Sequence, residues 1–141
     1  MEREIETRLK EREVRFTSGR RSVVGALAAS DGPRSAAELH AEIGVRVPLS
    51  SLYRSLAVLE DVGVLVPHFG MKGVTRYELA DWLQGHHHHL VCVNCGSVDD
   101  VELPAKVEER LHGLVDEIGS LSRFNPIDHV LEVEGRCSRC A

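Results

Sequence analysis

The sequence predicts an α+β fold in two parts: a helical first half that ends in a β-hairpin, and a second half of strands around one helix. Two observations predict this division. Apolar residues recur at helical spacing up to about residue 60, whereas later segments alternate polar and apolar residues as strands do. Two Cys-x-x-Cys pairs, at residues 92–95 and 137–140, lie in the second half. We therefore expect a first domain at 1–79, a hinge at 80–85 and a second domain at 86–141.

The composition is that of an ordinary globular protein. The 141 residues suffice for one compact domain or two small ones, and 43% of them are hydrophobic and 28% charged. No apolar run approaches the roughly 18 residues that indicate a membrane span. The charged start, "MEREIETRLKERE", is not a secretory signal. We expect a cytoplasmic protein with no membrane contact.

The formal net charge of −5 is unevenly shared. Residues 1–79 carry 12 Lys and Arg against 11 Asp and Glu, a net charge of +1, whereas residues 80–141 carry 5 against 11, a net charge of −6. The total charge argues against a general nucleic-acid binder, although a local basic face in the first half could still bind DNA. The acidic, histidine-rich second half is suited to binding cations.

Short helices are expected along the first 44 residues. Ile5 and Leu9 lie four residues apart in a charged, helix-forming segment. Ser35 caps a later helix, with Glu38 three residues on in a capping-box pattern. Between them, a helix starts at Ser18 and ends at the breaker "SDGP". Its apolar stripe comprises Val23, Val24, Leu27 and Ala28.

A longer helix and a β-hairpin follow. Pro48 suits the first turn of "PLSSLYRSLAVLEDVG", which Gly63 ends. Leu52, Leu56 and Leu59 form its expected buried face, and its other faces carry Ser51, Tyr53, Arg54 and Ser55. Two strands, "VLVPHF" and "VTRYEL", are joined by the turn "GMKG". This order describes a winged helix-turn-helix, whose last helix can enter a DNA major groove.

The second half is expected to contain the strands "HLVCV", "SVDDVEL" and "IDHVLEVEG" and a helix from Pro104 to about Ile118. Glu108 lies at the margin of the helix face that we expect to be buried. That face comprises Val107, Leu111, Val115 and Ile118. His40 and His112 are expected to be exposed helix residues.

The cysteines predict a zinc site. Cys92, Cys95, Cys137 and Cys140 supply four soft thiolates, the usual set for a closed tetrahedral zinc site. Two disulfides or free thiols are the alternatives, and a reducing cytoplasm disfavours disulfides. Because four thiolates leave no position open to a substrate, we expect the zinc to be structural.

Four consecutive histidines precede the first cysteine pair. In an extended segment, His86 and His88 face one way and His87 and His89 the other, so that each face starts a different metal site. The alternative is a solvated polar loop; a purification tag is disfavoured because the run is internal. His129 alternates with apolar residues and is either a further ligand or a satisfied core residue. For Glu108 the alternative is an exposed helix carboxylate.

The order of these motifs resembles the ferric uptake regulator family of metal-dependent repressors. The matching segments are "VRFTSGR", "PLSSLYRSLAVLEDVGVL", "HHHHLVCVNCG", His129 and the closing cysteine pair, and they span about Leu9 to Cys140. The resemblance implies an N-terminal winged helix-turn-helix that binds DNA and a C-terminal α/β dimerisation domain with a structural zinc bound by four cysteines.

The resemblance also implies two sites beside the structural zinc. One, in the dimerisation domain, comprises His86, His88, Glu108 and His129. The other, a regulatory site at the hinge, comprises Glu78, His87, His89 and, next to a one-residue insertion, Asp100. Many members have a further regulatory histidine where this chain has Pro33, and His68 on the wing, or a water, is expected to fill that position.

The DNA-binding residues follow from the same resemblance. Tyr53 and Arg54 match residues that contact bases and the backbone: tyrosine can contact a thymine methyl, and arginine a phosphate or guanine. Arg15 matches a basic residue that approaches a narrow, A/T-rich minor groove. The remaining expected contacts are Ser51, Arg20 and Arg21. For each arginine the alternative is a solvated surface charge.

Together these features predict a homodimeric, non-enzymatic repressor of metal-homeostasis or oxidative-stress genes, with a divalent metal as co-repressor and a palindromic, A/T-rich operator. The nitrogen and oxygen ligands suit Fe²⁺, Mn²⁺, Ni²⁺ or Zn²⁺, and the lack of a spare cysteine favours Fe²⁺ or Mn²⁺. A peroxide sensor, in which iron oxidises a ligating histidine, is a variant of this function. The alternatives from other classes are a small zinc-dependent hydrolase and a metal-buffering protein.

Overall fold

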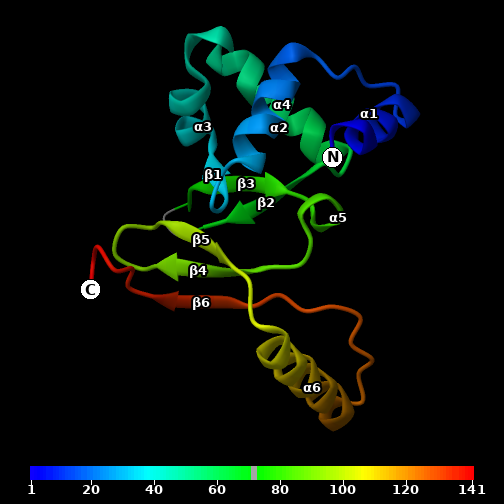
Figure 1. The fold of residues 1–141 in the computed structure, drawn as a ribbon, viewed down its shortest axis with the longest axis vertical. Helices are drawn as coiled ribbons and strands as arrows, with labels where there is room; N and C mark the ends of the chain where they lie inside the picture. The colour runs from blue at the N-terminus through cyan, green and yellow to red at the C-terminus, as the bar shows by residue number, and fades with distance from the viewer. Residues whose placement is uncertain (71–72) are drawn as a thin grey trace. The chain divides into compact units, whose positions relative to one another are not determined.

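The computed structural model describes residues 1–70 and 73–141, which form two compact units, Met1–Gly85 and His86–Ala141 (Figure 1). The predicted α+β fold is confirmed. The helices of the first unit are α1 (Glu2–Glu11), α2 (Ser18–Ala28), α3 (Ala36–Ile43), the 3-10 turn η1 (Gly44–Arg46), α4 (Leu49–Asp61) and α5 (Asp81–Gln84). Its strands are β1 (Arg34–Ser35), β2 (Leu65–Phe69) and β3 (Thr75–Leu79), antiparallel in the order β1-β3-β2. Met71 and Lys72 of the predicted turn "GMKG" lie outside the described residues.

Local chemistry sets several helix ends in the first unit. The Thr17 hydroxyl accepts a hydrogen bond from the backbone N–H of Arg20 and caps α2. The predicted capping box of α3 is present: the Glu38 N–H donates to the Ser35 hydroxyl at 3.1 Å, and the Ser35 N–H donates to the Glu38 carboxylate at 2.9 Å. Gly63, with φ of 77°, follows α4 in the left-handed region that glycine adopts without strain.

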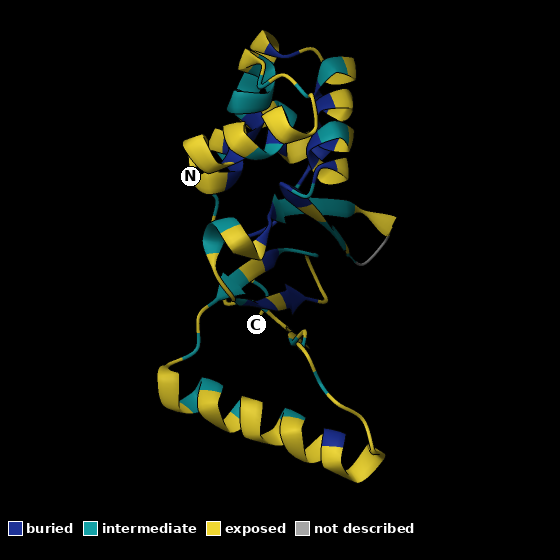
Figure 2. Ribbon diagram, turned by 90° about the vertical axis from the view of Figure 1, so that its right-hand side faces the viewer, coloured by how far each residue is buried: buried dark blue, intermediate teal, exposed yellow. Residues whose placement is uncertain are grey.

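The core of the first unit is aliphatic and is formed by buried residues of α1 to α4, β2 and β3 (Figure 2). Ile5 and Leu9 of α1 are buried, as are the predicted Leu52, Leu56 and Leu59 of α4. Each such side chain contributes about 1.5–3 kcal/mol on burial. This packing leaves the opposite side of α4 exposed.

Two side chains of this unit differ from expectation. Ser55 is buried, although it was predicted on an outer face of its helix, because it lies three residues after Leu52 and four before Leu59 and so shares their face. Ala28 is exposed, and the half-buried Ala26 packs against the core in its place.

Residues 80–85, the predicted hinge, contain α5 between its caps Ala80 and Gly85 and belong to the first unit. The Trp82 indole N–H donates to the Gly63 carbonyl at 2.8 Å, and the Arg8 guanidinium lies 4.6 Å from the centre of the Trp82 ring. Leu83 packs against the core. These contacts tie α5 to α1 and to the end of α4 within the first unit.

The second unit is a three-stranded sheet and one long helix. Its elements are β4 (His88–Cys92), β5 (Val98–Val101), α6 (Ala105–Ser122) and β6 (Glu132–Gly135). β4 is central: it pairs antiparallel with β5 and parallel with β6. α6 runs four residues past the predicted end, to a left-handed Arg123.

The segment after α6 also differs from the prediction. Only residues 132–135 of the expected strand at 127–135 are in the sheet, where they pair with residues 89–92 of β4. Ile127 is 96% exposed and Val133 49% exposed, so the apolar face to which His129 was assigned is not buried within one chain. Gly119 is the one buried residue of α6, and a Cβ there would meet Pro126 and Phe124 at 2.6–2.7 Å. This close approach holds the irregular segment against the end of α6.

The predicted buried stripe of α6 is not buried within one chain. Val107, Leu111 and Val115 are half-buried, and Ile118 is exposed together with Leu114 and Leu121. Among the described residues, no helix has the length and apolar character that a membrane crossing requires.

The α4 core face provides a direct test of this packing. Leu56→Ala should lower the free energy of unfolding by about 2–5 kcal/mol because it leaves a cavity among Leu52, Leu59 and their neighbours. The exposed Glu60→Ala on the same helix should change it by less than about 0.5 kcal/mol. Urea denaturation of the metal-loaded protein measures both values, and equal losses would contradict this description of the core.

Candidate metal centres

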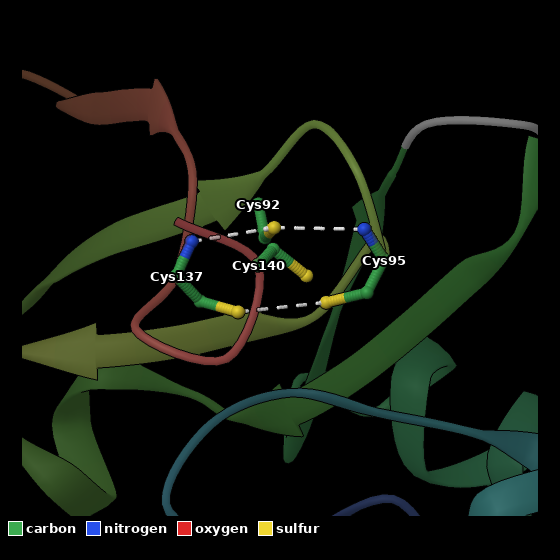
Figure 3. A group of neighbouring side chains, drawn as sticks. All are labelled: Cys92, Cys95, Cys137 and Cys140. Carbon is green, nitrogen blue, oxygen red and sulfur yellow. Dashed lines mark hydrogen bonds between the residues drawn. The ribbon is translucent and has the colours of Figure 1, made fainter.

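The four cysteines converge because β4 and β6 are parallel neighbours (Figure 3). Cys92 ends β4 and Cys95 follows in the next turn, whereas Cys137 and Cys140 lie in the turn after β6. Cys92 pairs with Gly135 across the two strands, which brings both turns to the same end of the sheet. All four sulfur atoms lie within 4.8 Å of one another.

The geometry of this four-cysteine cluster fits structural zinc. The Sγ atoms of Cys95 and Cys137 are 3.8 Å apart, about the spacing of two corners of a tetrahedron around an ion with bonds of about 2.3 Å. All four are free thiols. The Cys92 sulfur accepts hydrogen bonds from the backbone N–H groups of Cys95 at 3.5 Å and Cys137 at 3.4 Å. These bonds, that from Cys95 first, lower the pKa of Cys92 to about 5, so the thiolate that binds metal is present at neutral pH.

The histidine run divides into two clusters, as strand alternation predicts. His88 and His89 begin β4 and point to opposite faces, and His86 and His87 continue the alternation before the strand. His88 and His89 are both buried. A solvated polar loop is therefore excluded for His88 and His89, whereas His86 is exposed before the strand.

The first group, here called the Glu108 cluster, comprises His86, His88, Glu108 and His129, whose ligand atoms lie within 4.8 Å of one another. The Glu108 carboxylate accepts a hydrogen bond from His88 Nε2 at 2.8 Å and lies 3.3 Å from His86 Nε2 and 3.5 Å from His129 Nε2. Bonds of about 2.0–2.2 Å from one ion would place ligands at similar separations.

The electrostatics of the Glu108 cluster also suit a cation. The hydrogen bond from His88 lowers the pKa of Glu108. His129 Nε2 is buried and has no hydrogen-bond partner among the described residues, a cost that a coordinated ion would remove. Three imidazoles and a carboxylate are a donor set for Fe²⁺, Mn²⁺, Ni²⁺ or Zn²⁺.

The second group, the Asp100 cluster, comprises His87, His89 and Asp100 of the second unit. The β4–β5 register sets His89 opposite Asp100. Nε2 of His87 and Nε2 of His89 each lie 3.4 Å from the same Asp100 oxygen. Asp100, assigned next to a one-residue insertion, thus lies beside both histidines.

The other residues assigned to the regulatory site belong to the first unit. Glu78 is half-buried on β3, and His68 is half-buried on β2. Pro33, at the position of the missing regulatory histidine, is buried just before β1. Because these residues and the Asp100 cluster lie in different units, their joint role remains a proposal.

The candidate DNA-contacting residues lie in the first unit. Tyr53 and Arg54 are exposed on α4, and Ser51 is half-buried there. Arg15 is exposed in the segment between α1 and α2, and Arg20 donates to its carbonyl. Arg21 pairs with Glu2 and Glu6 and lies 4.2 Å from the Phe16 ring centre, and its phosphate contact stays a prediction.

His112 is a residue that sequence reasoning did not connect with a site. It is exposed, as predicted, but its Nε2 lies 3.5 Å from the Glu108 carboxylate. The signal in the sequence was its spacing of four residues from Glu108, which places both on one face of α6. His40, for which exposure was also predicted, is half-buried on α3.

Comparisons with known proteins point to one family. Residues 11–133 match the model of the "Ferric uptake regulator family". The "Ferric uptake regulation protein" of Bacillus subtilis is 32% identical over 142 residues, covering 96% of this chain and 91% of that protein. The protein of the same name from Neisseria meningitidis is 34% identical over 99 residues, covering 70% of this chain and 64% of its own length.

A solved structure supports the same fold. The Helicobacter pylori ferric uptake regulator, described as having three functional metal binding sites, has a TM-score of 0.76 and 25% identity, covering 98% of this chain and 89% of that chain.

Removing metal from the four-cysteine cluster should unfold the second unit before the first, because the sheet ends are joined by the cluster. We expect Cys95→Ser to lose about one zinc per chain and to expose the amides of β4 and β6 to hydrogen exchange, with α2 and α4 still protected. Ser138→Ala, in the adjacent turn, should retain zinc. Elemental analysis and hydrogen exchange give the readout, and unchanged protection of β6 in Cys95→Ser would contradict the expectation.

Proposed function

Because the chain belongs to the ferric uptake regulator family, we propose that it is a metal-responsive, DNA-binding transcriptional repressor that works as a homodimer. The observation that carries this proposal is the division of the histidine run into two carboxylate-centred clusters beside a four-cysteine cluster. A second unit with this many metal-binding groups suits the sensing of a divalent ion. The first unit supplies a helix and hairpin of the kind that bind DNA.

We assign the regulatory role to the Asp100 cluster, with Glu78 completing its ligand set and His68 or a water at the remaining position. A bound divalent ion would supply a strong local positive charge that joins these donors. His87 and His89 contribute neutral imidazoles, and Asp100 offsets the positive charge. The nitrogen and oxygen donors suit Fe²⁺, Mn²⁺, Ni²⁺ or Zn²⁺, and the absence of a cysteine from this ligand set favours Fe²⁺ or Mn²⁺, since all four cysteines lie in the four-cysteine cluster.

Glu78 gives metal binding a route to DNA binding. It lies on β3 of the DNA-binding hairpin, whereas His87 and His89 lie just beyond Gly85 at the start of the second unit. Joining these residues would restrict the movement of the first units and favour the arrangement that fits both halves of a palindromic operator. Metal and operator would then strengthen each other's binding, by about 5–150-fold for a typical coupling.

The exposed face of α4 is assigned to the DNA major groove. Tyr53 is 55% exposed although it is aromatic, and Arg54 is exposed beside it. No core contact explains an exposed tyrosine here, whereas contact with a thymine methyl does. Arg15, Arg20 and Ser51 are assigned to the minor groove and the phosphates.

The homodimer is supported by apolar side chains that one chain leaves uncovered. Leu114, Ile118 and Leu121 are exposed along α6, and Phe124 and Ile127 follow in the next segment. Leu114, Ile118 and Leu121 share one face of α6 by their spacing, and an exposed apolar face of this kind is typical of an interface. The second unit is therefore assigned to dimerisation.

The alternatives fit less well. Family members are non-enzymatic transcription factors, so a zinc-dependent hydrolase is rejected. A metal buffer would bind the same ions but has no use for the exposed Tyr53 and Arg54. Control of oxidative-stress genes, with an iron ligand histidine as the oxidised group, remains compatible with the Asp100 cluster.

The test measures DNA binding by the fluorescence anisotropy of a labelled DNA fragment taken from upstream of the gene. Zinc is kept in the four-cysteine cluster, and Fe²⁺, Mn²⁺, Ni²⁺ or Zn²⁺ is added in the absence of oxygen. Tight binding is expected with one metal, Fe²⁺ or Mn²⁺. Tyr53→Ala with Arg54→Ala should weaken DNA binding by about 10–100-fold or more without loss of metal. His87→Ala with His89→Ala should abolish the metal dependence.

The exposed Glu60→Ala on α4 serves as the control and should leave both properties unchanged. If the Tyr53/Arg54 variant bound DNA as tightly as the parent, the α4 assignment would be wrong. If neither this fragment nor sequences selected from a random pool bound with any metal, the repressor function would be wrong.

A further inference from the structure

His112 lies beside the Glu108 cluster although neither the spacing of the histidine run nor the family resemblance assigns it there. It is on α6, one turn after Glu108. Its Nε2 is 3.5 Å from the Glu108 Oε1 atom, the same distance that separates that oxygen from Nε2 of His129. The centres of the His112 and His129 rings are 5.2 Å apart.

Helix geometry explains this position. Residues four apart lie on the same face of a helix, so Glu108 and His112 present their side chains side by side. Three other histidines approach the same carboxylate: His86 from just before β4, His88 from β4 and His129 from the segment after α6. One carboxylate therefore has four imidazoles around it, each with Nε2 at 2.8–3.5 Å.

The four imidazoles differ in exposure. His88 is 2% exposed, whereas the His112 side chain is 60% exposed. The buried rings are fixed by their surroundings, but His112 can turn about its side-chain bonds toward or away from an ion near Glu108. An exposed ion pair at this spacing is too weak to hold the ring in place once a stronger partner is present.

We propose that His112 is a fifth ligand of the Glu108 cluster and that it shifts the preference of this site away from zinc. The proposal rests on the proposed function only in taking the Glu108 cluster as a metal site. The neutral Nε2 atom of His112 donates its lone pair to the ion that His86, His88, Glu108 and His129 hold.

Coordination number is the physical basis of the selectivity. Zinc in structural sites is almost always four-coordinate, and the other four residues already satisfy it. Mn²⁺, Fe²⁺, Co²⁺ and Ni²⁺ bind five or six ligands more readily and gain a bond from the additional imidazole. Loss of His112 should therefore weaken the binding of these ions and leave zinc binding nearly unchanged.

Co²⁺ is the probe, because its visible absorption is strong when the ion is tetrahedral and weak at higher coordination number. The protein is the full chain carrying His87→Ala and His89→Ala, which silence the Asp100 cluster, with zinc retained by the cysteines. Absence of sulfur-to-Co²⁺ charge-transfer bands verifies that cobalt does not enter the four-cysteine cluster. His112→Ala and His112→Gln are compared with His40→Ala and with the α6 variant Glu109→Ala.

We expect weak cobalt bands in the parent and in both controls, and strong tetrahedral bands in both His112 variants. Cobalt affinity should fall about 10–100-fold in the His112 variants, with zinc affinity, measured by competition with a chelator, falling less than about 3-fold. His112 is exposed, so circular dichroism should show both variants folded.

Three results would overturn the proposal, and they are distinguishable. Tetrahedral bands already in the parent, with no change on substitution of His112, would leave the Glu108 cluster a four-ligand metal site and remove His112 from it. No cobalt binding in the parent, or binding that Glu108→Gln leaves unchanged, would remove the metal site itself and with it this part of the proposed function. Equal loss of cobalt and zinc would show His112 to be a general ligand without the selectivity proposed.

Discussion

The register of β4 is the constraint on which the candidate sites depend. Side chains alternate across a strand, so one residue's shift in register would exchange the two histidine pairs between faces. Hydrogen bonds to β5 and β6 on both sides set that register, with His89 opposite both Asp100 and Glu132. The four-cysteine cluster lies at the end of the same strand and joins it to β6. The strand that separates the two histidine clusters is thus joined to β6 next to the four-cysteine cluster.

Each histidine cluster is organised around one carboxylate. Glu108 comes from a helix and Asp100 from the neighbouring strand, yet each lies within 2.8–3.5 Å of imidazole nitrogens. Buried imidazoles without a cation or an acceptor are costly, and a carboxylate reduces that cost when no ion is present. It also supplies negative charge for an incoming ion. The same residues can therefore stabilise the fold in both states and still respond to metal.

In the first unit, one helix carries both core residues and the candidate DNA-binding residues, on different faces. α4 places leucines on the core face and Tyr53 and Arg54 on the opposite face. Ser55 is buried with the leucines, so the exposed face of α4 is narrower than the sequence suggested. The indole N–H of Trp82 on α5 donates to the Gly63 carbonyl, which follows α4. Gly85 ends the first unit and His86 follows it directly, so the junction between the units in the sequence falls at the start of the histidine run. A regulator needs a junction of this kind.

Four features could be predicted from residue spacing and side-chain chemistry within short segments. They are the capping box of α3, the leucine face of α4, the convergence of two Cys-x-x-Cys pairs, and the division of the histidine run between two faces. Features that arise from contacts between segments far apart in the sequence became visible only in the folded structure. It replaced a predicted strand at His129 with an irregular segment, since the parallel pairing of β6 with β4 begins only at Glu132. It left the apolar face of α6 uncovered, and it placed His112 beside Glu108. Strand alternation and helix caps depend on a few neighbouring residues, so the sequence shows them directly. The segment at His129, the exposed face of α6 and the position of His112 depend on how whole elements pack together, and residue periodicity does not give the relative orientation of those elements.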